Sequence, residues 1–128
     1  MKVVKISPSH SDARGDITDI LRNDAVEYAT LITSKRGAVR ANHYHEHTFQ
    51  YVYLLEGRMR IVSQMPGGPR EEVVLEKGDL IVNMPLERHA FEAIDDCQIL
   101  VLTRGPRGGE DYETDTIRLA TPLIVPKP

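Results

Sequence analysis

The sequence predicts an all-β protein, built as a sandwich or barrel of short strands. Val and Ile together number 21 against 11 Leu, and β-branched residues favour strands. Gly and Pro contribute 17 of the 128 residues, and turn signals recur at short intervals, as at 35–37, 56–57 and 77–79. No segment keeps a helical apolar period over three turns. Short apolar segments between frequent turns are typical of a sandwich or barrel.

Segments of strand length lie between the turns. Residues 18–26 are interpreted as a strand followed by a turn, because polar residues interrupt the apolar pattern. Residues 99–102 read Ile-Leu-Val-Leu, which fits a strand buried on both faces. The three prolines of 121–128 predict an extended tail, lying along a barrel edge or a neighbouring subunit. The other strand-length segments are 50–55, 58–62 and 72–76, and His89 is expected to open a further short strand.

Length, charge and cysteine content exclude several classes of protein. A chain of 128 residues has the size of one domain, so residues 1–128 are expected to form a single domain. The net charge of −3 leaves no cationic excess for nucleic acid. No apolar run approaches the ~18 residues of a membrane span, and the first residues lack a secretory signal, so we expect a cytoplasmic protein. Cys97 is the single cysteine and is expected to be a structural thiol.

The histidines are the most informative residues. Side chains two residues apart share one face of an extended chain, so His43 and His45 could bind one metal ion together. His47 would join them only if the strand continued straight. Val39 has the same parity as His43, which indicates an inward face. A solvent-exposed polar strand would carry the same pattern, but His89, after a Pro-containing turn, supplies a further candidate ligand.

Two spacings resemble the signature motifs of the cupin superfamily. Gly37, five residues, His43-Tyr44-His45, four residues, Gln50, six residues and Gly57 resemble the first motif, at 37–57. Gly78, ten residues and then His89 keep the Gly-to-His spacing of the second motif, at 78–93. The resemblance implies a double-stranded β-helix, the jelly-roll barrel of the cupins. It also implies a homodimer, an expectation that sheet edges needing cover support.

The cupin resemblance also implies one divalent transition metal ion, Zn, Ni, Fe or Mn, inside the barrel. Carried over by position, its ligands would be His43, His45, Gln50 and His89. The family's glutamate is Gln50 here, and a neutral amide should weaken the binding of hard divalent ions. His47 could replace Gln50 as a ligand or act as an acid/base group. An imidazole-lined pocket without metal is the remaining alternative.

A second, shorter resemblance concerns activity. Residues 12–17, Asp-Ala-Arg-Gly-Asp-Ile, together with 42–45 are similar to cupins of sugar-nucleotide pathways, the keto-deoxysugar epimerases and isomerases. Ordinary turn chemistry also explains the Arg-Gly-Asp sequence. The resemblance implies a small polar ligand such as a keto-sugar, with proton abstraction next to its ketone and metal stabilisation of the enediolate. The alternatives are a metal-dependent dioxygenase or decarboxylase of a small organic acid, and a non-catalytic ligand-binding module.

Roles within that reaction are assigned to a few side chains. His47 is the expected base, because a neutral imidazole has suitable basicity near pH 7. Tyr112 is the expected proton donor. Arg40 and Arg104 are expected to contact a phosphate or carboxylate of the ligand, and Phe91 is expected to line the pocket.

Overall fold

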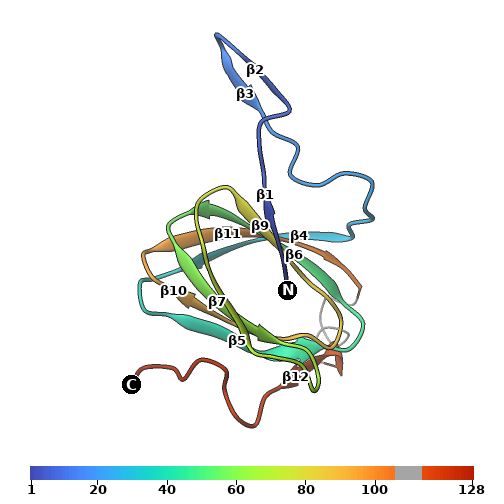
Figure 1. Ribbon diagram of the computed structural model, residues 1–128, viewed down its shortest axis with the longest axis vertical. Coiled ribbons are helices and arrows are strands. Elements are labelled where there is room, and N and C mark those ends of the chain that lie inside the picture. The colour runs from blue at the N-terminus through green and yellow to red at the C-terminus, as the bar shows by residue number, and fades with distance from the viewer. Residues whose placement is uncertain (106–113) are drawn as a thin grey trace.

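Two five-stranded sheets face each other and enclose the core of the protein (Figure 1). The computed structural model describes residues 1–105 and 114–128. The first sheet contains, in spatial order, β1 (Lys2–Lys5), β9 (Asp79–Asn83), β6 (Phe49–Glu56), β11 (Cys97–Arg104) and β4 (Tyr28–Ser34). The second contains β12 (Thr116–Arg118), β5 (Val39–His45), β10 (Arg88–Ala93), β7 (Met59–Gln64) and β8 (Glu71–Leu75). A separate two-stranded sheet pairs β2 (His10–Asp12) with β3 (Gly15–Ile17).

The strand order confirms the predicted all-β jelly roll. Neighbours within each sheet are mostly distant in sequence and antiparallel, as between β6 and β11 and between β5 and β10. The strand predicted within residues 18–26 is wrong, because β3 ends at Ile17 and the next strand begins at Tyr28. Asn23, with a φ of 57°, lies in the left-handed region that asparagine tolerates in turns. Turn chemistry therefore outweighs the apolar residues of this segment.

Inward-facing apolar side chains fill the space between the sheets. Burial alternates along β11, so every second residue from Cys97 to Thr103 is buried. Cys97 is 4% exposed and its thiol donates to the backbone oxygens of Arg58 and Asp95, which agrees with a structural thiol. The buried members of the main core cluster are Val52, Leu54, Met59, Ile61, Leu75, Ile81, Phe91, Ala93, Cys97, Ile99 and Val101.

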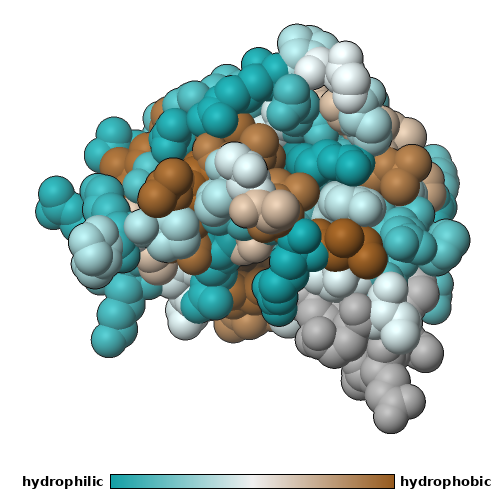
Figure 2. Space-filling model, turned by 90° about the horizontal axis from the view of Figure 1, so that it is seen from below, coloured by the Kyte–Doolittle hydropathy of each residue, from teal (hydrophilic) through white to brown (hydrophobic). Residues whose placement is uncertain are grey.

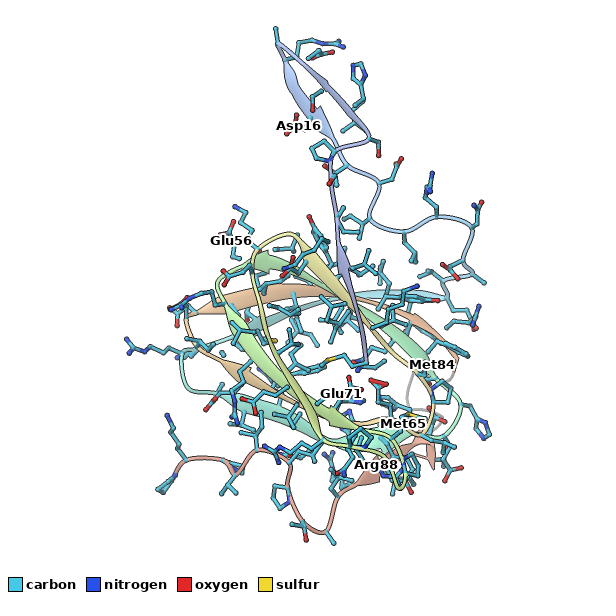
Figure 3. The ribbon with its side chains drawn as sticks, in the orientation of Figure 1. Asp16, Glu56, Met65, Glu71, Met84 and Arg88 are labelled. Atoms are coloured by element: carbon cyan, nitrogen blue, oxygen red, sulfur yellow. The ribbon has the colours of Figure 1, made fainter. Side chains whose placement is uncertain are left out.

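Polar side chains replace apolar ones at one end of this interior. In the first sheet, Gln50 pairs with Asn83 on one side and Thr103 on the other. In the second sheet, His89 pairs with His43. All five residues are buried. Figure 3 labels Met84 and Arg88 from the β9–β10 region, which lie toward the lower right of the barrel, and Glu56, which lies toward the upper left. The backbone nitrogen of Leu86, between Met84 and Arg88, donates to the oxygen of His45, so the β9–β10 loop contacts this polar end.

A β-bulge in β5 changes which side chains face inward. His89 pairs with His43, but Ala90 pairs with Ala41, so Asn42 is an extra residue. Because of this extra residue, Arg40 pairs with the core residue Phe91, which reverses the faces expected for the part of β5 before Asn42. Val39 packs against the outer cluster of Val62, Ala90 and Ile124, yet it also lines the cavity that His43 borders, so the expected inward face is confirmed only in part.

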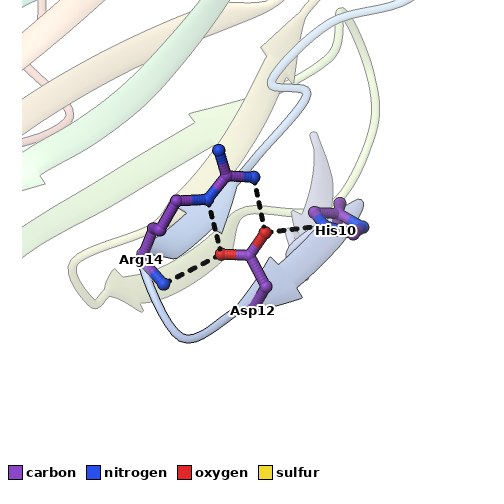
Figure 4. Close-up of polar contacts among 3 residues, drawn as sticks. All are labelled: His10, Asp12 and Arg14. Carbon is purple, nitrogen blue, oxygen red and sulfur yellow. Dashed lines mark hydrogen bonds and ion pairs between the residues drawn. The ribbon is translucent and has the colours of Figure 1, made fainter.

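Two segments lie outside the barrel. The β2–β3 hairpin projects away from it, with Asp16 far from the core (Figures 1 and 3). Within the hairpin, Asp12 accepts hydrogen bonds from Arg14 and contacts His10 (Figure 4). The C-terminal segment runs below β5 and β12 (Figure 1), and the face seen from below carries apolar side chains in separate groups between hydrophilic ones (Figure 2). Across the described residues, no helix has the length and apolarity needed to cross a membrane.

Candidate functional site

Three histidines from two adjacent strands converge at the polar end of the barrel. The ring centroid of His43 lies 4.7 Å from that of His45 and 4.8 Å from that of His89. The centroids of His45 and His89 are 5.5 Å apart. One nitrogen of each ring lies within 4.8 Å of the other two, and all three side chains are buried. The motif spacing therefore identified imidazoles that are distant in sequence and adjacent in space.

His89 has a defined tautomer. Its Nδ1 lies 3.0 Å from the backbone oxygen of Glu87, so Nδ1 carries the hydrogen and donates it. Nε2 therefore presents a lone pair, and it has no hydrogen-bond partner among the described residues. Burial, with a smaller contribution from the charge of His45, lowers the pKa of His89 to about 3. His89 is accordingly a neutral imidazole, stacked on Phe91 with centroids 5.4 Å apart.

His45 lies beside a buried carboxylate. Oδ2 of Asp115 is 3.7 Å from Nδ1 of His45, and the Thr116 hydroxyl is 3.3 Å from the same nitrogen. Asp115 is itself fixed, because its carboxylate accepts hydrogen bonds from the backbone nitrogen of His47 and from the hydroxyl of Thr48. A carboxylate on one ring nitrogen orients an imidazole and raises the basicity of the other nitrogen.

A cavity of about 350 Å³ opens onto this cluster. Arg40 enters it because the bulge reverses the alternation before Asn42, and Arg118 enters it because it pairs with His43 across β12 and β5. Nε of Arg40 donates to the hydroxyl of Ser34 on the opposite sheet, 2.8 Å away. The lining residues are Ile32, Val39, Arg40, Ala41, His43, Gln50, Phe91, Ile99, Val101 and Arg118. The cavity thus combines an apolar wall with two guanidinium groups and an imidazole.

Arg40 also borders a second hollow, of about 700 Å³. Among the described residues, Arg40 is the one lining residue that this hollow shares with the cavity. The lining residues of the hollow are Thr33, Ser34, Lys35, Ala38, Arg40, Glu56, Asp96, Cys97 and Gln98.

The structure brings some of the sequence-predicted residues into the cavity and leaves others out. His43, Gln50, Phe91 and Arg40 line it. The side chain of His47 is 74% exposed and lies near Glu46, because β5 ends at His45 and the chain turns there.

Arg104 and Tyr112 are the two remaining sequence-predicted side chains. Arg104 packs over the ring of Phe49, 4.2 Å from its centroid, and is absent from the cavity lining. It pairs with Phe49, while its neighbour Thr103 pairs with the cavity residue Gln50, so Arg104 lies on the outer face of the sheet. Tyr112 lies outside the described residues.

Asp115 and Arg118 belong to the site but were not singled out from the sequence. The acidic stretch that contains Asp115 reads as a solvated loop, and its burial depends on β12 pairing with β5. Strand β12 has only three residues, too few for an alternating pattern to stand out.

The three imidazoles fit a divalent transition metal ion. Imidazole nitrogens suit Zn, Fe and Ni, and the Nε2 lone pair of His89 is directed away from its hydrogen-bonded Nδ1. Nδ1 of His89 is held by a backbone oxygen and Nδ1 of His45 lies near a carboxylate, the arrangement that usually orients metal-binding histidines. Gln50 borders the same cavity and offers a neutral oxygen.

Solved structures with the same fold include enzymes that act on sugar nucleotides. The QdtA sugar 3,4-ketoisomerase from Thermoanaerobacterium thermosaccharolyticum, in complex with TDP, superposes with a TM-score of 0.76 and 21% identity, covering 93% of this chain and 88% of that one. The WlaRB TDP-quinovose 3,4-ketoisomerase from Campylobacter jejuni gives a TM-score of 0.78 and 16% identity, covering 92% of each chain. The dTDP-4-dehydrorhamnose 3,5-epimerase from Sulfolobus tokodaii gives 0.69 and 19%, covering 84% and 71%.

Sequence comparison identifies the family directly. No curated protein matches the sequence significantly. The family model of the cupin domain matches residues 30–103, which include both histidine motifs. Because the match spans more than half of the chain, this protein belongs to the cupin domain family.

Proposed function

We propose that this protein is an isomerase or epimerase of a keto-sugar that carries an anionic group. One observation carries the proposal: the cavity is lined by His43, Arg40 and Arg118. The ring of His45, which lies beside the buried Asp115 carboxylate, is 4.7 Å from the ring of His43 between centroids. An imidazole beside a carboxylate suits proton abstraction, and guanidinium groups suit an anion. A fold shared with 3,4-ketoisomerases and a 3,5-epimerase supports the same reaction class.

His45 replaces His47 as the proposed base. Nε2 of His45 takes a proton from the carbon next to the ketone, and the electron pair of that C–H bond forms the double bond of an enediolate. For an isomer, His45 gives the proton to the former ketone carbon, and the hydroxyl proton of the deprotonated carbon passes to the former ketone oxygen. For an epimer, a solvent proton adds to the opposite face of the deprotonated carbon, and the imidazolium of His45 releases its proton to solvent. Asp115 stabilises the imidazolium that forms between the two steps.

Arg40 and Arg118 are proposed to hold the anionic part of the substrate. Both arginines line the cavity, Arg40 from the same strand as His43 and Arg118 from the neighbouring strand β12. Arginine forks match the oxygens of a phosphate group, so a sugar nucleotide fits this end of the site. The second hollow, which Arg40 also lines, offers space for the nucleoside. The TDP complex of the QdtA ketoisomerase supports this class of ligand.

Metal dependence is a second candidate arrangement, favoured by the buried Nε2 lone pair of His89. His43, His45 and His89, with Gln50, would hold the ion. Once bound there, a divalent ion would polarise a carbonyl oxygen. In that arrangement His45 is a ligand and cannot also be the base, so the two arrangements respond oppositely to a chelator.

Deuterium exchange tests the proposal. TDP-4-keto-6-deoxyglucose, the ligand of one solved ketoisomerase complex, is incubated with the protein in D2O and followed by NMR. We expect deuterium at carbons next to the ketone, loss of exchange in His45→Asn, and near-normal exchange in His47→Asn. Activity that survives EDTA supports His45 as the base, whereas activity restored only by added metal supports the metal centre. Tight binding of the sugar nucleotide without any exchange would contradict the isomerase proposal and leave a binding protein.

A further inference from the structure

Asn42 lies between three of the polar residues that border the cavity, Arg40, His43 and Arg118. It follows Arg40 by two residues and precedes His43. Its backbone oxygen accepts a hydrogen bond from Leu119, the residue after Arg118, at 2.9 Å. Regular strand geometry would place side chains three residues apart on opposite faces, yet Arg40 and His43 both line the cavity. The bulge at Ala41 and Asn42 makes this possible.

The bulge requires an unfavourable backbone conformation. Ala41 and Asn42 have φ values of 70° and 56°, in the left-handed region. This region is unfavourable for residues with a side chain, and less so for Asn, whose side chain can hydrogen-bond locally. Two consecutive residues persist there only where the surroundings hold them.

The C-terminal segment supplies that support through the Asn42 amide. Oδ1 of Asn42 accepts from the backbone nitrogens of Leu123 and Ile124, at 2.8 and 3.2 Å. Nδ2 donates to the backbone oxygen of Ile124 at 2.8 Å. Ile124 is 4% exposed and packs against Val62 and Ala90 on the outside of the second sheet. The segment is therefore anchored by its own apolar contacts and can fix Asn42 in turn.

We propose that Asn42 is a positioning residue, through which residues 119–124 hold Arg40, His43 and Arg118 together around the cavity. The catalytic significance of this role rests on the proposed function. The positioning itself concerns only the geometry of the cavity. Without the amide, the bulge loses its three side-chain bonds and relaxes toward regular pairing, which turns Arg40 away from Ser34 and from the cavity.

The test compares variants that separate backbone strain from side-chain bonding. Asn42→Gly keeps a residue that accepts a positive φ and removes the three bonds. Asn42→Asp keeps the acceptor for Leu123 and Ile124 and removes the donor. Asn23→Gly is the matched control, because Asn23 also has a positive φ but lies in the loop before β4. Ile124→Ala removes the apolar contacts that anchor the C-terminal segment and keeps the Asn42 side chain.

Two measurements are made on each variant. The first is the NMR signal of the Arg40 Nε–H, which donates to Ser34 and needs no ligand. The second is the affinity for TDP by calorimetry. We expect Asn42→Gly to shift and broaden the Arg40 signal and to weaken TDP binding by about tenfold or more. Asn42→Asp and Ile124→Ala should show smaller changes in the same direction, and Asn23→Gly none.

The Arg40 signal decides between a positioning role and a merely structural one. If Asn42→Gly and Ile124→Ala lower the Tm but keep the wild-type Arg40 signal, the bonds to the C-terminal segment are merely structural. If the wild-type protein does not bind TDP, the proposed anionic ligand is wrong, and the Arg40 signal alone still decides whether Asn42 positions the cavity.

Discussion

The Asp115 carboxylate lies 3.7 Å from Nδ1 of His45, although 70 residues separate the two in sequence. Both side chains are buried, and the other contacts of Asp115 come from the backbone of His47 and the hydroxyl of Thr48. Strand β12 pairs with β5, which brings Asp115 next to the turn that follows His45. Nε2 is the other nitrogen of the His45 ring, and it is the atom that we propose for proton transfer or metal binding.

Replacing Asp115 by Asn should impair both the proposed reaction and the fold. The neutral amide cannot stabilise an imidazolium, so we expect exchange into a keto-sugar nucleotide to fall by roughly 100-fold. The amide NH2 group can also face the donors of His47 and Thr48, which should lower the free energy of unfolding by about 1–3 kcal/mol. Thr48→Val is the matched control, because it removes one hydrogen bond to Asp115 and leaves the carboxylate in place. Unchanged exchange in Asp115→Asn would exclude the carboxylate from the mechanism.

The metal centre makes a separate prediction. In protein purified without a histidine tag, His43→Ala and His89→Ala should each abolish stoichiometric Zn²⁺ or Ni²⁺ binding, measured by elemental analysis after dialysis, while the barrel stays folded. His47→Ala should keep full occupancy, since its side chain is exposed. Gln50→Glu should tighten binding, because a carboxylate restores the negative charge that divalent ions favour. Full occupancy in both alanine variants would show that the ligands are misassigned.

Arg118 should determine affinity for the anionic part of the ligand. We expect Arg118→Gln to weaken TDP binding about tenfold, equivalent to about 1.4 kcal/mol. Arg118→Lys should recover only part of this loss, because lysine keeps the charge but not the planar fork. Arg88→Gln is the control, since Arg88 packs over Tyr44 and does not border the cavity. Equal TDP affinity in the Arg118→Gln variant and the wild type would show that Arg118 does not bind the anionic part of the ligand.

The contacts of Asp12 with Arg14 and His10 in the β2–β3 hairpin predict a lowered pKa for Asp12. Hydrogen bonds from the Arg14 side chain and backbone, and then from His10, lower the pKa of Asp12 from 3.8 to about 2. Because the folded-state pKa is the lower one, the stabilisation is present above about pH 4 and disappears as the pH falls toward 2. A carboxyl NMR titration should give a midpoint near 2, and Arg14→Gln should raise it toward 3.8. A wild-type midpoint for Asp12 near 3.8 would show that the pair of Asp12 and Arg14 does not form in solution.

The sequence was sufficient for several strands and for the histidine cluster. Strands β6, β7, β8, β10 and β11 coincide with predicted segments, because alternation and turn residues act over a few neighbours and are visible in the sequence. Strands β1, β4, β9 and β12 were not predicted. His43 and His89 could be paired from motif spacing, since strand register fixes which side chains meet. The strand predicted at 18–26 is absent, because polar turn residues dominate that segment.

The tertiary structure decided which residues complete the site. Arg40 faces inward only through the bulge at Asn42, and that bulge is held by residues about 80 positions later in the chain. Asp115 reaches His45 only because β12 pairs with β5, and His47 turns outward where β5 ends. Periodicity and spacing are local properties, and a sequence displays them directly. The side of the sheet that Arg40 occupies depends on hydrogen bonds between distant segments, which exist only once the chain has folded.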